Sequence, residues 1–290
     1  MRAALRAALL LVAASSWLAT SASAFAFLTP VTTPCQSCPG GVAFDVAASY
    51  LANPRWTAGP ATHSLQGGLL VWISPGMAGS FGVSDPELAA KIEATIASGV
   101  LAWSSPVISF DIVLGGVAPS GTDISIGSGF TQSIGGRTDF STAYSLGRQL
   151  TNGEILPGTI FTGAVITLNQ STLTNMFSLI GESFALAALQ RLVAHEMGHA
   201  LGLGHPTDVY QYNVVNDSSA GLIVSPDAVD DTAIMVPFSS LPGLHASFDP
   251  TMRLDDLAGR DVLYPAPEPA GLLLAAVGAL AGGIVRRALA

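Results

Sequence analysis

The chain has 290 residues, of which 11 are basic and 20 are acidic, so its formal net charge is −9 at pH 7. When the two ends are set aside, residues 25–264 keep seven basic and nineteen acidic side chains, a net charge near −12. This balance excludes a basic surface for nucleic acid or anionic lipid. The 240 residues between the ends have the size of one domain with a substantial core.

Residues 1–24 have the pattern of a signal peptide. Arg2 and Arg6 precede an apolar run over residues 7–14, and a small-residue cleavage site, Ala-Ser-Ala, ends at Ala24. The apolar run is short for a membrane span. We therefore expect cleavage after Ala24 and export of the mature chain.

Residues 25–54 form an N-terminal extension that is rich in Pro, Gly, Ala and Thr and has little periodicity. It holds the only two cysteines of the chain, Cys35 and Cys38. Because the protein is expected to be exported, we predict a disulfide between them. A redox pair and a thiolate that caps a zinc ion are the alternatives.

Apolar runs predict the strands of a buried sheet. We expect strands over residues 69–73, 107–114, 123–126 and 159–169. The segment 127–158 carries many Gly, Ser and Thr residues and no strong periodicity, so we expect it to be mostly loop.

Two long helices are predicted. The first begins at Ser84 or Asp85, with Pro86 in its first turn, and carries an apolar stripe at helical spacing that we assign to the core. The second begins at about residue 179 or 182 and ends at Leu201. Its side chains expected to face inward are Phe184, Leu189, Leu192 and Val193.

Three of the five histidines fall within residues 195–205. His195 and His199 are four residues apart, so a helix places both imidazoles on one face. Glu196 lies beside them, where its carboxylate can reach a water on a shared metal. Gly202 lets the chain leave the helix and bring His205 to the same point. Three neutral imidazoles with one open position form a catalytic zinc site, because a structural site would fill all four positions with protein.

The pattern H-E-x-x-H-x-x-G-x-x-H over residues 195–205 is identified as that of the metzincin proteases. The segments 122–124 and 255–264 are most similar to matrixins. The resemblance covers residues 55–264 and implies an α+β fold. Its metzincin-like catalytic domain would have a twisted mixed five-stranded sheet, an active-site helix and a smaller C-terminal subdomain.

The same resemblance implies a methionine turn beneath the zinc ion. Met235, in Ala-Ile-Met-Val-Pro, would provide an apolar floor for the imidazoles and would not be a ligand. Val236 stands where matrixins usually have Tyr, and Pro237 excludes a tyrosine ligand from that position. A proline directly after the third histidine, as at Pro206, is similar to the serralysin sequence pattern. The assignment to a matrixin-like or a serralysin-like subfamily therefore stays open. Acidic residues between 115 and 170 are too sparse to predict Ca²⁺ sites.

Residues 265–290 read Pro-Glu-Pro, an apolar segment over residues 270–285, and then Arg286-Arg287. As a helix this segment would be about 24 Å long, a little short of a hydrocarbon core of about 30 Å. The order resembles the PEP-CTERM sorting tail of bacterial exported proteins. It implies transient membrane insertion of a short transmembrane segment, removal by an exosortase, and release to the cell surface or extracellular matrix. A plain membrane anchor is the alternative.

Together these features predict an exported zinc-dependent endopeptidase acting on a protein or peptide substrate. Zinc held by His195, His199 and His205 would activate a water, and Glu196 would be the general base. Two other classes remain open. One is a non-proteolytic surface or matrix protein with a vestigial metal site, and the other is a zinc hydrolase acting on a non-peptide bond.

Overall fold

The structure is a computed structural model that describes residues 25–36, 42–59, 64–65, 67–133, 135–206, 214–217, 221–224, 232–237 and 249–267. The predicted signal peptide, Cys38 and the predicted sorting tail beyond residue 267 lie outside these ranges. Among the helices of the described ranges, none has the length and apolar character needed to cross a membrane.

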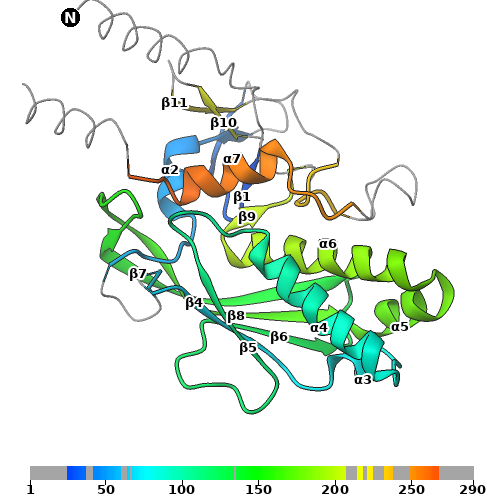
Figure 1. The fold of residues 1–290 in the computed structure, drawn as a ribbon. Helices are drawn as coiled ribbons and strands as arrows, with labels where there is room; N and C mark the ends of the chain where they lie inside the picture. Colours follow the sequence, from blue (N-terminus) through cyan, green and yellow to red (C-terminus); the bar gives the residue numbers. More distant parts are fainter. Residues whose placement is uncertain are drawn as a thin grey trace, which may run out of the picture.

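A mixed sheet of five strands forms one layer of the molecule (Figure 1). Its order is β5-β4-β6-β8-β7, and all neighbours are parallel except β7, which pairs antiparallel with β8 at the edge. The strands are β4 (Leu69–Ile73), β5 (Phe110–Leu114), β6 (Ile124–Gly129), β7 (Gly136–Gln149) and β8 (Ile155–Asn169). The predicted five-stranded mixed sheet is therefore confirmed, within a mixed α/β fold.

Two long helices pack on one face of this sheet (Figure 1). They are α4 (Pro86–Leu101) and α6 (Glu182–Ala200), preceded by the shorter α3 (Met77–Ser80) and α5 (Gln170–Leu179). Asp85 is the N-cap of α4, because its side chain accepts a hydrogen bond from the main-chain N–H of Glu87. At Gly99 the two long helices approach so closely that a Cβ would lie 2.8 Å from the main-chain oxygen of Gln190. This contact sets how closely α4 and α6 pack.

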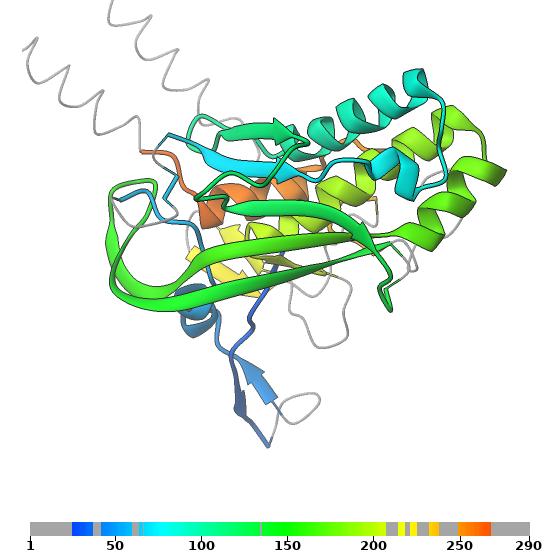
Figure 2. The ribbon, with the colours of Figure 1, turned by 90° about the horizontal axis from the view of Figure 1, so that it is seen from below.

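Three sequence-based expectations are wrong. Residues 136–149, expected to be loop, form β7, and β8 begins at Ile155, which is earlier than expected. Figure 2 shows these two strands as a long hairpin that extends beyond the rest of the sheet. The exposed side chains of β7 leave no apolar periodicity, so its strand conformation depends on pairing with β8. Phe184, expected to face inward, is 44% exposed, whereas Leu189, Leu192 and Val193 are buried as predicted.

The segment before the sheet packs against the region after α6. β1 (Ala26–Phe27) pairs antiparallel with β9 (Leu203–Gly204), and Phe25 and Phe27 belong to the main hydrophobic core. Next along the chain come β2 (Thr32–Pro34), β3 (Val42–Phe44) and α2 (Val46–Ala52). After β9 the described elements are β10 (Val214–Asp217), β11 (Gly221–Val224) and α7 (Leu254–Leu263).

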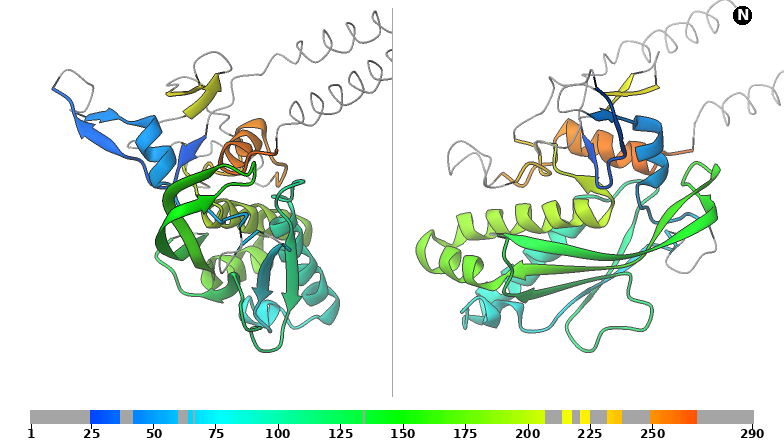
Figure 3. Two further views of the ribbon diagram at one scale, coloured as in Figure 1. Left: turned by 90° about the vertical axis from the view of Figure 1, so that its left-hand side faces the viewer. Right: turned by 180° about the vertical axis from the view of Figure 1, so that it is seen from behind.

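Two buried arginines contact the C-terminal end of α2, which is the blue helix in Figure 3, and one of them also contacts α7. Arg55 donates hydrogen bonds to the main-chain oxygens of Tyr50, in α2, and Leu263, in α7. Arg148 donates to the main-chain oxygens of Asn53 and Thr159. Cations are favourable at the C-terminal ends of helices, where carbonyl groups lack helical partners. The Arg55 guanidinium thus joins α2 to α7, and the Arg148 guanidinium joins the end of α2 to β8.

Candidate metal centre

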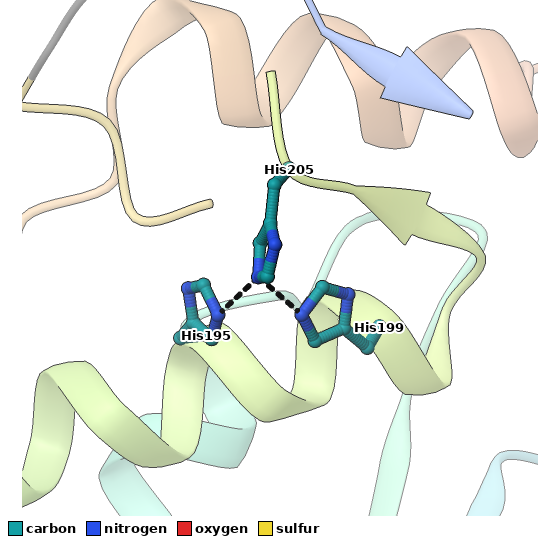
Figure 4. A group of neighbouring side chains, drawn as sticks. All are labelled: His195, His199 and His205. Carbon is teal, nitrogen blue, oxygen red and sulfur yellow. Dashed lines mark hydrogen bonds between the residues drawn. The ribbon is translucent and has the colours of Figure 1, made fainter. Parts of the chain in front are cut away.

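Three imidazoles converge at the C-terminal end of α6 (Figure 4). His195 and His199 project from the same face of this helix, and His205 follows β9. The Nε2 atom of His205 lies 3.0 Å from Nε2 of His195 and 2.9 Å from Nε2 of His199. The three histidines could therefore hold a metal ion between them.

Gly202 makes the reversal that brings His205 back to the helix. Its φ is +100°, a conformation that residues with a side chain rarely adopt. A Cβ at this position would also lie 2.6 Å from the main-chain oxygen of Pro54 and 2.9 Å from Nδ2 of Asn53. Asn53 donates a hydrogen bond to the main-chain oxygen of Gly202, so the N-terminal segment supports the turn directly.

The second nitrogen of each helical histidine is held by a carbonyl oxygen. Nδ1 of His195 lies 2.7 Å from the oxygen of Ile234, and Nδ1 of His199 lies 2.7 Å from the oxygen of Leu203. A carbonyl only accepts, so both Nδ1 atoms carry a hydrogen and both Nε2 atoms present lone pairs. One proton on His205 can satisfy only one of them. A shared cation satisfies all three nitrogens, and carbonyls that orient the opposite ring nitrogen are typical of metal sites.

The environment keeps the two helical imidazoles neutral. Burial lowers the pKa of His195 well below its usual value, and the neighbouring His199 and His205 lower it further. Burial, and then the proximity of His205, lower the pKa of His199 to about 4. Neutral imidazole is the form that binds a metal ion. Imidazole nitrogens suit zinc, copper, iron and nickel alike, so the donor set defines a metal site without naming the metal.

Glu196 lies in the same cleft and is only 4% exposed. Its Oε2 accepts a hydrogen bond of 2.6 Å from the hydroxyl of Thr138 on β7. Burial raises the pKa of Glu196 to about 7, and the hydrogen bond from Thr138 opposes that rise. A carboxyl group with this environment can exchange a proton near neutral pH.

The cleft has a volume of about 340 Å³ and is bounded by α6, the start of β7, the segment after β1 and the end of the 232–237 turn. Polar and apolar groups both line it. Its walls are Leu28, Ser133, Gly135, Gly136, Arg137, Thr138, Phe140, Leu192, His195, Glu196, His199, His205 and Pro237.

Met235 lies against the helix that carries the histidines. A Cβ at Gly198 would lie 2.1 Å from its sulfur and 2.8 Å from Cζ2 of Trp103, so the missing side chain makes room for both groups. Trp103 also donates a hydrogen bond from Nε1 to the main-chain oxygen of Ala194. Two distant parts of the chain thus pack against α6 at Gly198, between the two helical histidines.

Asp256 fixes the turn that contains Met235. Its carboxylate accepts hydrogen bonds from the main-chain N–H groups of Ile234, Met235 and Arg253. Arg191, buried on α6, donates to the main-chain oxygens of Thr232 and Ala233 in the same turn. Since the carbonyl of Ile234 holds His195, these contacts determine the orientation of a candidate ligand.

Three residues that contribute to this site were not predicted from the sequence. Thr138 lies in a segment expected to be loop, and nothing in its neighbourhood signalled a contact with Glu196. Asp256 lies in the matrixin-like segment 255–264, and its hydrogen bonds to the turn at residues 234 and 235 were not predicted. Arg191 did carry a signal, because it interrupts an apolar stretch of the helix four residues before His195.

Cys35 is disulfide-bonded and is not one of the residues that line the cleft. Its expected partner, Cys38, lies outside the described residues, so this pairing stays a prediction.

The sequence matches no protein-family model and no curated protein. The three-histidine centre and the mixed sheet therefore rest on the geometry of this chain alone.

Proposed function

We propose that the protein is an exported zinc-dependent endopeptidase of the metzincin type, most similar to matrixins. One observation carries the proposal: three Nε2 atoms converge beside a buried carboxylate in an open cleft. A structural zinc site would have four protein ligands. Among the described residues only His195, His199 and His205 form such a group, which leaves a position for water or substrate.

Zinc, when bound, supplies an acidified water and a Lewis acid for the scissile carbonyl. Glu196 accepts a proton from the attacking water and passes it to the departing amine. Glu196 is buried in the cleft with one oxygen held by Thr138, so its carboxyl group is fixed beside the three imidazoles. The apolar side chains of Leu28, Leu192 and Pro237 in the walls limit the access of bulk water.

Export and processing complete the proposal. The signal peptide would deliver the chain outside the cytoplasm, and the PEP-CTERM-like tail would be removed by an exosortase. The protease would then act at the bacterial surface or in the extracellular matrix, on protein or peptide substrates. The support for this step is the order of features at the two ends of the sequence.

The test is peptide hydrolysis by the mature protein. The purified protein would be incubated with a peptide library, the products read by mass spectrometry, and the bound metal measured on the same preparation. We expect cleavage that stops on addition of a zinc chelator and returns with zinc. A zinc-loaded protein that cleaves no peptide would contradict the proposal and favour a non-proteolytic role or a non-peptide substrate.

A further inference from the structure

Glu196 is held by a strand that the sequence did not predict. Thr138 Oγ1, on β7, lies 2.6 Å from Oε2 of Glu196 and 3.0 Å from the main-chain oxygen of the same residue. A hydroxyl has one hydrogen, and a carboxylate attracts it more strongly than a carbonyl does. The donation therefore goes to Oε2.

The other carboxylate oxygen of Glu196, Oε1, faces Gly136 at the start of β7. A Cβ at Gly136 would lie 3.1 Å from Oε1 of Glu196 and 3.2 Å from its Cγ, so any side chain there would press on the carboxylate. One residue earlier, a Cβ at Gly135 would lie 2.6 Å from Cδ1 of Leu192. The start of β7 thus packs closely along the helix face that carries Leu192 and Glu196. Within the described ranges, no hydrogen bond to Oε1 is present.

We infer that Thr138 is a positioning residue that fixes Oε2 of Glu196 and leaves Oε1 as the oxygen that takes the proton from water. This inference rests on the proposed peptidase function. It assigns the two carboxylate oxygens different tasks, one structural and one chemical. Thr138 lines the cleft, and in this scheme its hydroxyl acts only through the carboxylate of Glu196.

The hydroxyl should affect the chemical step more than substrate binding. Without the Thr138 hydroxyl, the Glu196 side chain can adopt other rotamers. Oε1 then lies within reach of the attacking water in a smaller fraction of the molecules. The rest of the cleft still binds peptide. A loss confined to the reacting geometry lowers kcat and leaves KM nearly unchanged.

The experiment compares three variants of the mature, zinc-loaded protein. Thr138→Val removes the hydroxyl and keeps the branched shape suited to a strand, Thr138→Ser restores the hydroxyl, and Thr142→Val removes an exposed hydroxyl from the same strand. We expect Thr138→Val to lower kcat by about 10–100-fold, the usual effect of losing a hydrogen bond to a charged group. KM and zinc content should stay near wild type. Thr138→Ser should recover most of the rate, and Thr142→Val should match wild type.

A double variant and a structure provide readouts that stability alone would not change. In a Glu196→Gln background, Thr138→Val should cause no further loss, because both changes act through one carboxylate. In a crystal structure of Thr138→Val, the Glu196 carboxylate should leave its wild-type position. A kcat near wild type for Thr138→Val, or an equal loss in Thr142→Val, would overturn the inference. If the wild type cleaves no peptide, the proposed function fails, and an unmoved carboxylate in the crystal would still overturn the inference separately.

Discussion

Asp256 accepts a hydrogen bond from the main-chain N–H of Ile234, with Oδ2 and N 2.9 Å apart. The carbonyl of Ile234 in turn holds Nδ1 of His195 at 2.7 Å. Ile234 thus connects the carboxylate of Asp256, on α7, with the imidazole of His195, on α6. The C-terminal helix is therefore coupled to the candidate metal centre even though none of its residues lines the cleft.

Asp256→Asn should destabilise the protein and weaken metal binding. The amide removes the charge that accepts three main-chain N–H groups, and such bonds contribute about 1.5–3 kcal/mol each when one partner is charged. We expect a melting temperature lower by at least about 5 °C and a higher zinc dissociation constant. The control is Asp261→Asn on the same helix, where the carboxylate is 61% exposed and pairs with Arg260. Equal stability of the two variants would contradict this role.

Glu196→Gln should keep the fold and the metal while peptide hydrolysis is lost. Glutamine has the size of glutamate and cannot accept the proton from water. General acid–base catalysis contributes about 10²–10⁴-fold, so turnover should fall by at least that order. Zinc content, melting temperature and turnover are measured on one preparation. Turnover within a few-fold of wild type would exclude Glu196 as the base.

His199→Ala should lose the metal and the activity together. His199 provides one of the three converging nitrogens, and two imidazoles bind zinc far more weakly than three. Metal analysis after dialysis checks this, with His63→Ala as a control outside the motif. A His199→Ala protein that keeps a full complement of zinc would remove His199 from the ligand set.

Gly202→Ala should destabilise the protein more than a glycine substitution that has only backbone strain. Alanine at φ +100° is strained, and its Cβ would also clash with the main-chain oxygen of Pro54. Gly153→Ala is the matched control, because Gly153 has a φ of +88° and nothing within 4 Å of its Cβ position. The control should lose about 1–2 kcal/mol of stability, and Gly202→Ala should lose more and bind less zinc. Denaturant unfolding curves that coincide for the two variants would show that the close contact with Pro54 has no effect.

In its native host, the mature protein should lack the C-terminal segment 270–290. The order of Pro-Glu-Pro, apolar segment and twin arginine predicts recognition and removal by a sorting protease. Mass spectrometry of the protein from surface and membrane fractions gives the C-terminal residue directly. Intact tail in the membrane fraction would instead support a plain anchor.

The sequence by itself determined the features that depend on spacing along one element. His195 and His199 share a helix face because four residues make about one turn. Gly202 was expected to make the reversal because only glycine adopts positive φ without cost, and its φ of +100° agrees. The strand over residues 69–73 followed from a run of apolar residues, and the buried stripe of α4 followed from apolar residues at helical spacing.

Tertiary structure alone decided the parts that depend on pairing between distant residues. β7 carries no apolar alternation, so only its long pairing with β8 makes it a strand and brings Thr138 to Glu196. Asp256 reaches the turn at Ile234 across 22 residues, and Asn53 reaches Gly202 across 149. Such hydrogen bonds produce no recognisable pattern in the sequence. A single polar residue looks the same in the sequence whether its side chain faces solvent or bonds to a buried main-chain group. Local conformation therefore placed the candidate metal ligands, and long-range contacts decided what holds them and their carboxylate neighbour in place.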